Sequence, residues 1–264
     1  MKTLIRYLKI YVRLVNISTS STIVYRMSFI NNLISSSVWA GLTIITTLLI
    51  THNAKTLYGW SQWEMMLLTG TYTLVWGLFN IFLSKNVHEM PFLIDSGRLD
   101  RILMLPVDSQ FMVGFTRMNP VAVIRLVVGS IVIFTSLQNL KIQVNPLSIL
   151  GYIILLVLGS IIIYSVWQIV LTALIWFEQL SNLIDFMYSV SGMMRYPSEM
   201  YTQLSQFIVI AFPFLLVSVI PTRFLLNSVS LPTVLLFTSA AFFSLSLSLF
   251  FWKRALRSYT SANA

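Results

Sequence analysis

Few side chains in this sequence of 264 residues could do chemistry: there are eight Asp and Glu, two His and no Cys. Without cysteine there can be no thiolate zinc site, disulfide or cysteine nucleophile. His88-Glu89 begins like the His-Glu-x-x-His helix of zinc peptidases, but Phe92 stands where the second His is needed. Glu178 and Asp185 are seven residues apart and could share a helical face as a proton relay. Because both stand beside polar neighbours at the end of an apolar segment, we interpret them as surface residues.

Phosphate chemistry is missing as well. No Gly-x-x-x-x-Gly-Lys-Ser/Thr loop occurs, so we expect the chain neither to cradle ATP phosphates nor to bind another cofactor. We therefore predict no enzymatic activity in this chain. Any energy from ATP has to arrive from a partner.

Arg125 is the one charge inside an otherwise apolar stretch of spanning length, Met118 to Leu137. It could contact a substrate or a neighbouring chain. It also lies only eight residues after Arg117, so its long side chain could reach the membrane interface. We favour the interface.

The composition requires a membrane around these residues. The sequence is 57% hydrophobic and 9% charged, whereas about 25% of residues are charged in soluble domains. The sequence is therefore that of an all-α integral membrane protein. A formal charge of +9 would suggest nucleic acid in a soluble protein, but in a membrane protein it indicates Lys and Arg on the cytoplasmic side, so we expect no nucleic-acid partner.

Stretches without Asp, Glu, Lys, Arg or His mark the candidate spans, because a spanning helix needs about 20 apolar residues. Five qualify: Ser28 to Thr51, Met65 to Ser84, Leu147 to Phe177, Met200 to Thr222, and Phe224 to Trp252. Met118 to Leu137 is a sixth, and the weaker Gln179 to Met194, with Asp185, is a seventh.

The basic residues orient these spans. Five Lys and Arg precede the first span, four lie between Lys85 and Arg117, and three follow the last, which places 12 of 17 on one side. Basic residues concentrate on the cytoplasmic side. Both termini and the 85–117 loop are therefore predicted to be cytoplasmic, and the number of crossings is even. We predict six.

Two topologies satisfy that parity. In the first, 179–194 is a cytoplasmic connection and 200–222 crosses the membrane. In the second, 179–194 runs back outward and 200–222 is a re-entrant hairpin on the far side. Pro213 could break this segment into two half-helices, and Pro197 and Pro221 bracket it.

The N-terminal segment 1–22 carries basic residues every three or four positions, on one helical face, with apolar residues covering the rest. We interpret it as an amphipathic helix in the membrane interface. The alternative is a cytosolic helix packed on a partner. The residues expected to reach lipid headgroups are Lys2, Arg6, Lys9 and Arg13.

The 85–117 loop holds half of the acidic residues, which sets it apart from a plain linker. Between Pro91 and Pro106, apolar and charged residues alternate at near-helical spacing, and Gly97 is expected to divide the run into two short amphipathic helices. Such a helix can insert into a groove on a soluble partner. The alternative, a helix lying along the membrane, fits the mixed charge less well.

The order of elements resembles the permease subunit of a type-2 ABC exporter, and in particular a group of bacterial permeases of about this length. Their cytoplasmic loop carries a Gly-x-Leu-Asp-x-x-Leu-x-x-Pro pattern, which stands here as Gly97, Leu99, Asp100, Leu103 and Pro106. A second similarity is Tyr196-Pro197, followed by Tyr201 and Ile220-Pro221.

The resemblance implies one permease domain over 1–264, in a bacterial plasma membrane, with 85–108 as the loop that docks on an ATP-binding subunit. The coupling residues would be Asp95, Gly97, Arg98, Leu99, Asp100, Leu103 and Pro106. It also implies a re-entrant hairpin at 200–222, a second permease subunit, identical or related, and two ATPase subunits that hold ATP and magnesium. Surrounding lipid completes the expected partners.

Two other functions fit a membrane protein of this size. A secondary transporter would normally be larger and carry intramembrane carboxylates for ion coupling. A structural or assembly protein without transport would need neither the larger size nor the intramembrane carboxylates.

Overall fold

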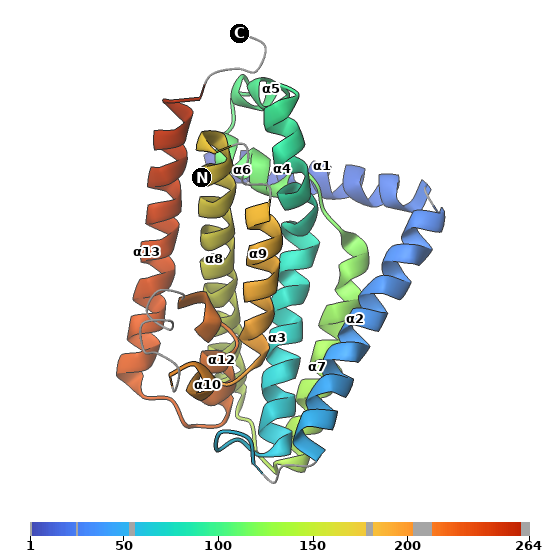
Figure 1. Cartoon of the computed structure of the whole chain (residues 1–264), viewed down its shortest axis with the longest axis vertical. Helices are drawn as coiled ribbons and strands as arrows, with labels where there is room; N and C mark the ends of the chain where they lie inside the picture. The colour runs from blue at the N-terminus through green and yellow to red at the C-terminus, as the bar shows by residue number, and fades with distance from the viewer. Residues whose placement is uncertain (1, 25, 53–55, 178–181, 203–212, 260–264) are drawn as a thin grey trace.

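The computed structural model describes residues 2–24, 26–52, 56–177, 182–202 and 213–259. These residues form helices and connecting turns, with one isolated bridge between Leu57 and Trp60 and no strand in the described ranges. Figure 1 shows an elongated bundle from which the first helix projects sideways. The chain is an all-α membrane protein, as predicted.

The elements follow in this order: α1 (Lys2–Val24), α2 (Arg26–His52), α3 (Gln62–Phe82), α4 (Ser84–Asp95), α5 (Leu99–Leu103), α6 (Ser109–Phe115), η1 (Pro120–Ala122), α7 (Val123–Asn139), α8 (Pro146–Trp176), α9 (Asn182–Ser191), η2 (Gly192–Arg195), α10 (Ser198–Thr202), η3 (Pro213–Leu216), α12 (Val219–Leu225) and α13 (Leu231–Leu256). Here the α5 end is the end of the bundle that carries α5 and the last turns of α13. The opposite end, which carries α10, is the α10 end (Figure 1).

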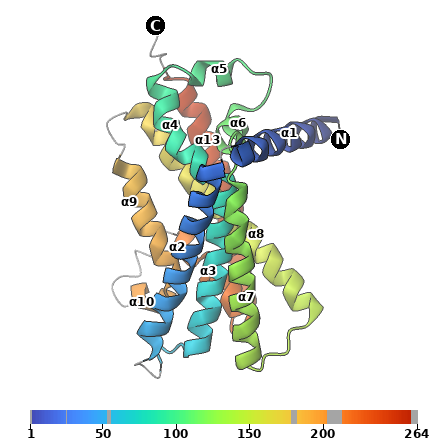
Figure 2. The ribbon, with the colours of Figure 1, turned by 90° about the vertical axis from the view of Figure 1, so that its right-hand side faces the viewer.

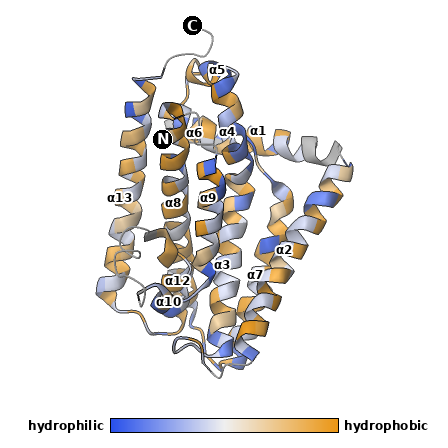
Figure 3. Ribbon diagram, in the orientation of Figure 1, coloured by the Kyte–Doolittle hydropathy of each residue, from blue (hydrophilic) through white to orange (hydrophobic). Residues whose placement is uncertain are grey.

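Five helices in the described ranges are long and apolar enough to cross a membrane: α2, α3 with α4, η1 with α7, α8, and α13. They correspond to predicted stretches. Figure 3 shows hydrophobic residues along the whole of α8, whereas hydrophilic residues gather at α5. The last span begins later than predicted, at Leu231, because α12 continues to Leu225 and Asn227 turns the chain with a φ of 52° before Pro232 starts α13.

Between α8 and α13 the chain returns along the bundle. Figures 1 and 2 show α9 in the middle of the bundle, running toward the α10 end, where α10 lies with α12. The second topology predicts a return in this direction, and its sixth crossing stays a prediction, because five helices of the described ranges have spanning length. The predicted hairpin at 200–222 falls partly on residues 203–212, which lie outside the described residues.

Helix α3 is the centre of the bundle: 72% of the apolar window of α3 and α4 is buried, against 17% of that of α2. Glycines let α3 and α7 approach closely, since a Cβ on Gly70 would lie 2.8 Å from Ile133 and 3.2 Å from the Gly129 carbonyl. Hydroxyl pairs add polar contacts, Thr47 to Thr69 and Thr71 to Tyr152, each at 2.9 Å.

Candidate functional site

The loop between α3 and α7 is built on a helix that continues out of the membrane-crossing bundle. Leu83 caps both α3 and α4, so α4 extends α3 with almost no break. Val87, Met90 and Ile94 lie on one face of α4 at helical spacing and are all buried. Pro91 lies inside α4 instead of bounding the first amphipathic piece as predicted. The helix begins at Ser84 as a continuation of α3. It then runs through Pro91, although proline has no backbone N–H to donate to a helical hydrogen bond.

Gly97 separates α4 from α5, as predicted. Its φ is +64°, a conformation that a side chain disfavours, and its N–H donates to the Ile94 carbonyl at 3.1 Å. The chain therefore turns within three residues, between Asp95 and Leu99.

The predicted coupling residues on and around α5 form two sets, one packed inward and one exposed. Leu99 is fully buried, and Ile102 and Leu103 pack against the core beside it. These residues anchor the helix on the core, while Asp100 lies in its first turn. Leu99 and Leu103 follow the same helical spacing that a docking face would show, so the sequence alone could not tell which side faces inward.

The outward side forms an exposed patch at the tip of the molecule. Met104 is 76% exposed, and Phe92 and Leu105 are 49% and 43% exposed. The Arg98 guanidinium lies 4.8 Å from the centre of the Phe92 ring. The α5 surface consists of Phe92, Asp95, Arg98, Arg101, Met104 and Leu105. Its three apolar members were not predicted as site residues.

Helix α1 holds the segment that follows α5. Arg6 donates to the Pro106 carbonyl at 2.8 Å, and the Tyr7 hydroxyl accepts from the Asp108 N–H at 3.0 Å. The Tyr7 ring meets Phe111 edge to face at 5.1 Å. Pro106, one of the predicted coupling residues, is thus a contact of α1.

The remaining α1 residues fit the interfacial interpretation. The side chains of Lys9 and Arg13 are exposed, while that of Lys2 lies outside the described side chains. Burial raises the pKa of the Tyr11 hydroxyl above its ordinary value. Helix α1 therefore leaves Lys9 and Arg13 exposed, while Arg6, Tyr7 and Tyr11 contact the loop and the end of α3.

A buried amide closes the loop onto α4. Asn86 donates to the carbonyls of Gly114 and Arg117 and accepts from the Arg117 N–H, each at 2.8 Å. Glu89 adds an ion pair with Arg117 at 2.6 Å. Sequence reasoning missed Asn86, because nothing in its local pattern distinguishes it from a solvent-facing asparagine.

Two further contacts join the loop to the last span. Gln110 of α6 donates to Ser248 at 2.7 Å, and the Trp252 indole donates to Ser109 at 3.0 Å. The loop is therefore tied to both α3 and α13, helices that are far apart in sequence.

The three prolines of the predicted hairpin lie in separate elements. Pro197 is buried between η2 and α10, and Pro221 is buried inside α12. Pro213 begins η3, and its side chain lies outside the described side chains. An ion pair between Arg223 and Glu199 joins α12 to α10.

The other residues considered for chemistry are not brought together. His88 stacks on Tyr188, Asp185 is exposed on α9, and Glu178 lies outside the described residues. Arg125 is half-buried in the first turns of α7, beside Gly77. Among the described residues, no group of three or more His, Asp and Glu could hold a metal ion.

A comparison with family sequence models identifies the chain. The model described as "ABC-2 family transporter protein" matches residues 37–263, which is most of the sequence. The chain belongs to the ABC-2 family. Neither the curated proteins nor the solved structures gave a match.

Membership in the ABC-2 family confirms the resemblance to type-2 ABC permeases that the loop motif and the order of elements indicated. This ABC-2 protein is a multi-pass membrane component of a transporter, and the family implies association with an ATP-binding subunit. The match begins at residue 37, inside α2, so α1 lies outside the matched region, whereas the loop that it contacts lies within it.

Proposed function

We propose that this ABC-2 protein is the permease subunit of an ATP-driven exporter and that the α5 surface docks on the ATP-binding subunit. The observation that supports this best is an exposed apolar patch, Met104 and Leu105, directly after a helix that is anchored by the buried Leu99. Exposed apolar residues rimmed by charges are typical of a protein interface. Arg98, Arg101 and Asp95 would set the register.

The contacts around α5 support a mechanism of coupling. Helix α4 continues α3, and α6 is bonded to α13 through Gln110 and Ser109. A displacement of α5 by closing ATPase subunits would therefore act on two membrane helices at once, as rigid elements. We infer that this motion opens and closes a path between two permease subunits, alternately from each side.

The surface of α2 supports a second permease. Its apolar side chains are exposed on several sides, among them Met27, Trp39 and Leu49, each above 60%. Apolar exposure along a membrane helix suits lipid or another helix, and the small area that α2 buries within this chain leaves room for a partner. We propose an identical or related permease on this side, and two ATPase subunits holding ATP and magnesium.

The orientation follows from charge. The α5 end carries Arg98, Arg101 and Lys253, so it would face the cytoplasm, with both chain termini, in a bacterial plasma membrane. We propose six crossings, with α9 and η2 as the short fifth and 200–222 as a re-entrant hairpin.

Copurification tests the docking proposal. Met104→Asp and Leu105→Asp place a charge on the α5 surface without touching the anchored face. Each should lower recovery of the ATP-binding subunit with the tagged permease by at least tenfold, the effect of losing about 1.4 kcal/mol of binding.

Lys253→Asp is the matched control, because it adds the same side chain at an exposed position of the same end, outside the α5 surface. Undiminished recovery with both α5 variants would show that the subunit docks elsewhere. Leu99→Asp would not be informative, because burying a carboxylate there would unfold α5 whatever its partner.

A further inference from the structure

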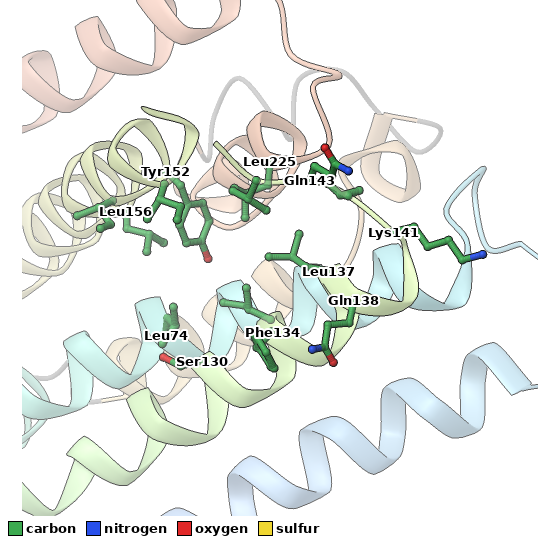
Figure 4. Close-up of a pocket in the computed structure, with 15 residues that line it drawn as sticks. Leu74, Ser130, Phe134, Leu137, Gln138, Lys141, Gln143, Tyr152, Leu156 and Leu225 are labelled. Carbon is green, nitrogen blue, oxygen red and sulfur yellow. The ribbon is translucent and has the colours of Figure 1, made fainter. Parts of the chain in front are cut away.

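A groove of about 680 Å³ lies between α7 and α8 in the half of the bundle nearer the α10 end. Figure 4 shows Leu137 of α7 on one side of the groove, with Tyr152 and Leu156 of α8 and Leu225 of α12 on the other. Its volume is that of a site for a ligand of several hundred daltons.

The groove exists because its two walls are held by different partners. Helix α7 packs on α3 through Gly70 and Gly129, while α8 packs on α13 at Gly159 and on α12 at Gly151. Figure 2 shows the first turns of α8 leaning away from α7, although only residues 140–145 connect the two helices. The gap is therefore part of the packing and does not depend on a side-chain rotamer.

The lining is apolar along the walls and polar at one rim. Ile133, Leu137 and Leu156 are typical of the walls, and the Tyr152 hydroxyl is already bonded to Thr71. Apart from Ser130, the remaining polar residues of the lining gather at the α10 end: Gln138, Lys141 and Gln143.

Lys141 stands at this rim in an unusual backbone conformation. Its φ is +54°, at the position after α7 where glycine is the usual residue, and its N–H donates to the Gln138 carbonyl at 3.1 Å. A lysine there carries a strain that glycine would not. Figure 4 shows its ammonium extending beyond the rim, away from the leucines of the groove.

Lys141 also differs from the other described cations near that end. Arg223 pairs with Glu199, and the Arg195 guanidinium lies 4.9 Å from the centre of the Tyr196 ring. Lys141 is exposed and has no carboxylate partner among the described residues. A cation on the membrane surface above an apolar groove matches a ligand with an anionic group joined to a hydrocarbon chain.

We propose that this groove binds one phospholipid with an anionic headgroup, an acyl chain lying between α7 and α8 and the phosphate at Lys141. Between membrane helices only hydrocarbon can fill an apolar gap without stranding polar groups. An ammonium is a strong point-charge partner for phosphate. The site requires neither transport nor an ATP-binding subunit, so it stands independently of the proposed function.

Native mass spectrometry of the full chain in detergent tests the site, with dioleoyl phosphatidylglycerol and dioleoyl phosphatidylcholine titrated separately. Wild type should bind one phosphatidylglycerol about fivefold more tightly than phosphatidylcholine, since one basic residue near a membrane surface contributes roughly 1 kcal/mol. Lys141→Gly should abolish this preference while relieving the backbone, so the fold should survive. Lys141→Arg should keep the preference.

Ser130→Phe tests the chain-binding part, because a ring at this exposed position on the groove wall should displace the tight lipid of either kind. Ser239→Phe is the matched control on the exposed side of α13, outside the groove. Equal affinity of wild type for both lipids, or full occupancy in Ser130→Phe, would overturn the proposal. So would a shift from dimer to monomer in Ser130→Phe with unchanged lipid count, which would make the groove an interface between chains.

Discussion

Replacing Asn86 by alanine should loosen the loop between α3 and α7 more than any other single polar deletion on α3 or α4. Three hydrogen bonds, each at 2.8 Å, join this amide to residues about 30 positions later in the chain. At about 1 kcal/mol for each net hydrogen bond, the loss is roughly 3 kcal/mol. For a chain of this size that lowers Tm by about 6 to 12 °C.

Asn80→Ala is the matched control. The Asn80 amide donates only to the Trp76 carbonyl one turn earlier in the same helix, at 2.7 Å, so its removal should cost about 1 kcal/mol and about 2 to 4 °C. Thermal unfolding of the purified protein in detergent, followed by the fluorescence of its seven tryptophans, measures both.

Limited proteolysis separates a loosened loop from general destabilisation. In Asn86→Ala, trypsin should cut after Arg117 well below the unfolding temperature, because both backbone groups of Arg117 lose their partner. Equal Tm shifts in the two variants, with no faster cleavage at Arg117, would refute the view that Asn86 closes the loop.

Two glycines give sharper steric predictions. Gly97→Val should lower recovery of the ATP-binding subunit, since a β-branched residue at a φ of +64° costs about 1 to 2 kcal/mol and displaces α5. Gly97→Asn should be tolerated better. Equal recovery of the subunit with both variants would contradict this. Gly70→Leu should lower Tm by several degrees, because its Cβ alone would lie 2.8 Å from Ile133. Gly41→Leu on α2 should not lower Tm, because a Cβ there has nothing within 4 Å. Equal Tm values in a thermal scan would contradict the close packing of α3 and α7.

The bounds of an element could be predicted from the sequence where one local signal determined them. The apolar run of α8 gave its ends to within a residue, and Gly97 marked the break between α4 and α5 because only glycine adopts that conformation cheaply. Hydropathy could not place the start of α13, since the apolar run after Arg223 begins inside α12 and the turn at Asn227 adds no charge that would divide it.

The site was predictable only as a segment. Composition marked out the 85–117 segment as a candidate, but which face of α5 points inward depends on packing with α4 and α6, so Leu99 was grouped with residues that are exposed. Pro91 suggested a boundary that tertiary contacts overrode. The role of Asn86 depends on carbonyls from α6 and beyond, a distance along the chain at which single-sequence patterns carry no information.

The continuity of α3 and α4 has a mechanical consequence. From Gln62 to Asp95 the two form one rod of 34 residues, and at 1.5 Å per residue that is about 50 Å, some 20 Å longer than the hydrocarbon core of a bilayer. A soluble subunit could therefore bind this rod well outside the lipid and tilt it. A small tilt about its tightly packed middle, near Gly70 and Gly77, would swing its two ends in opposite directions.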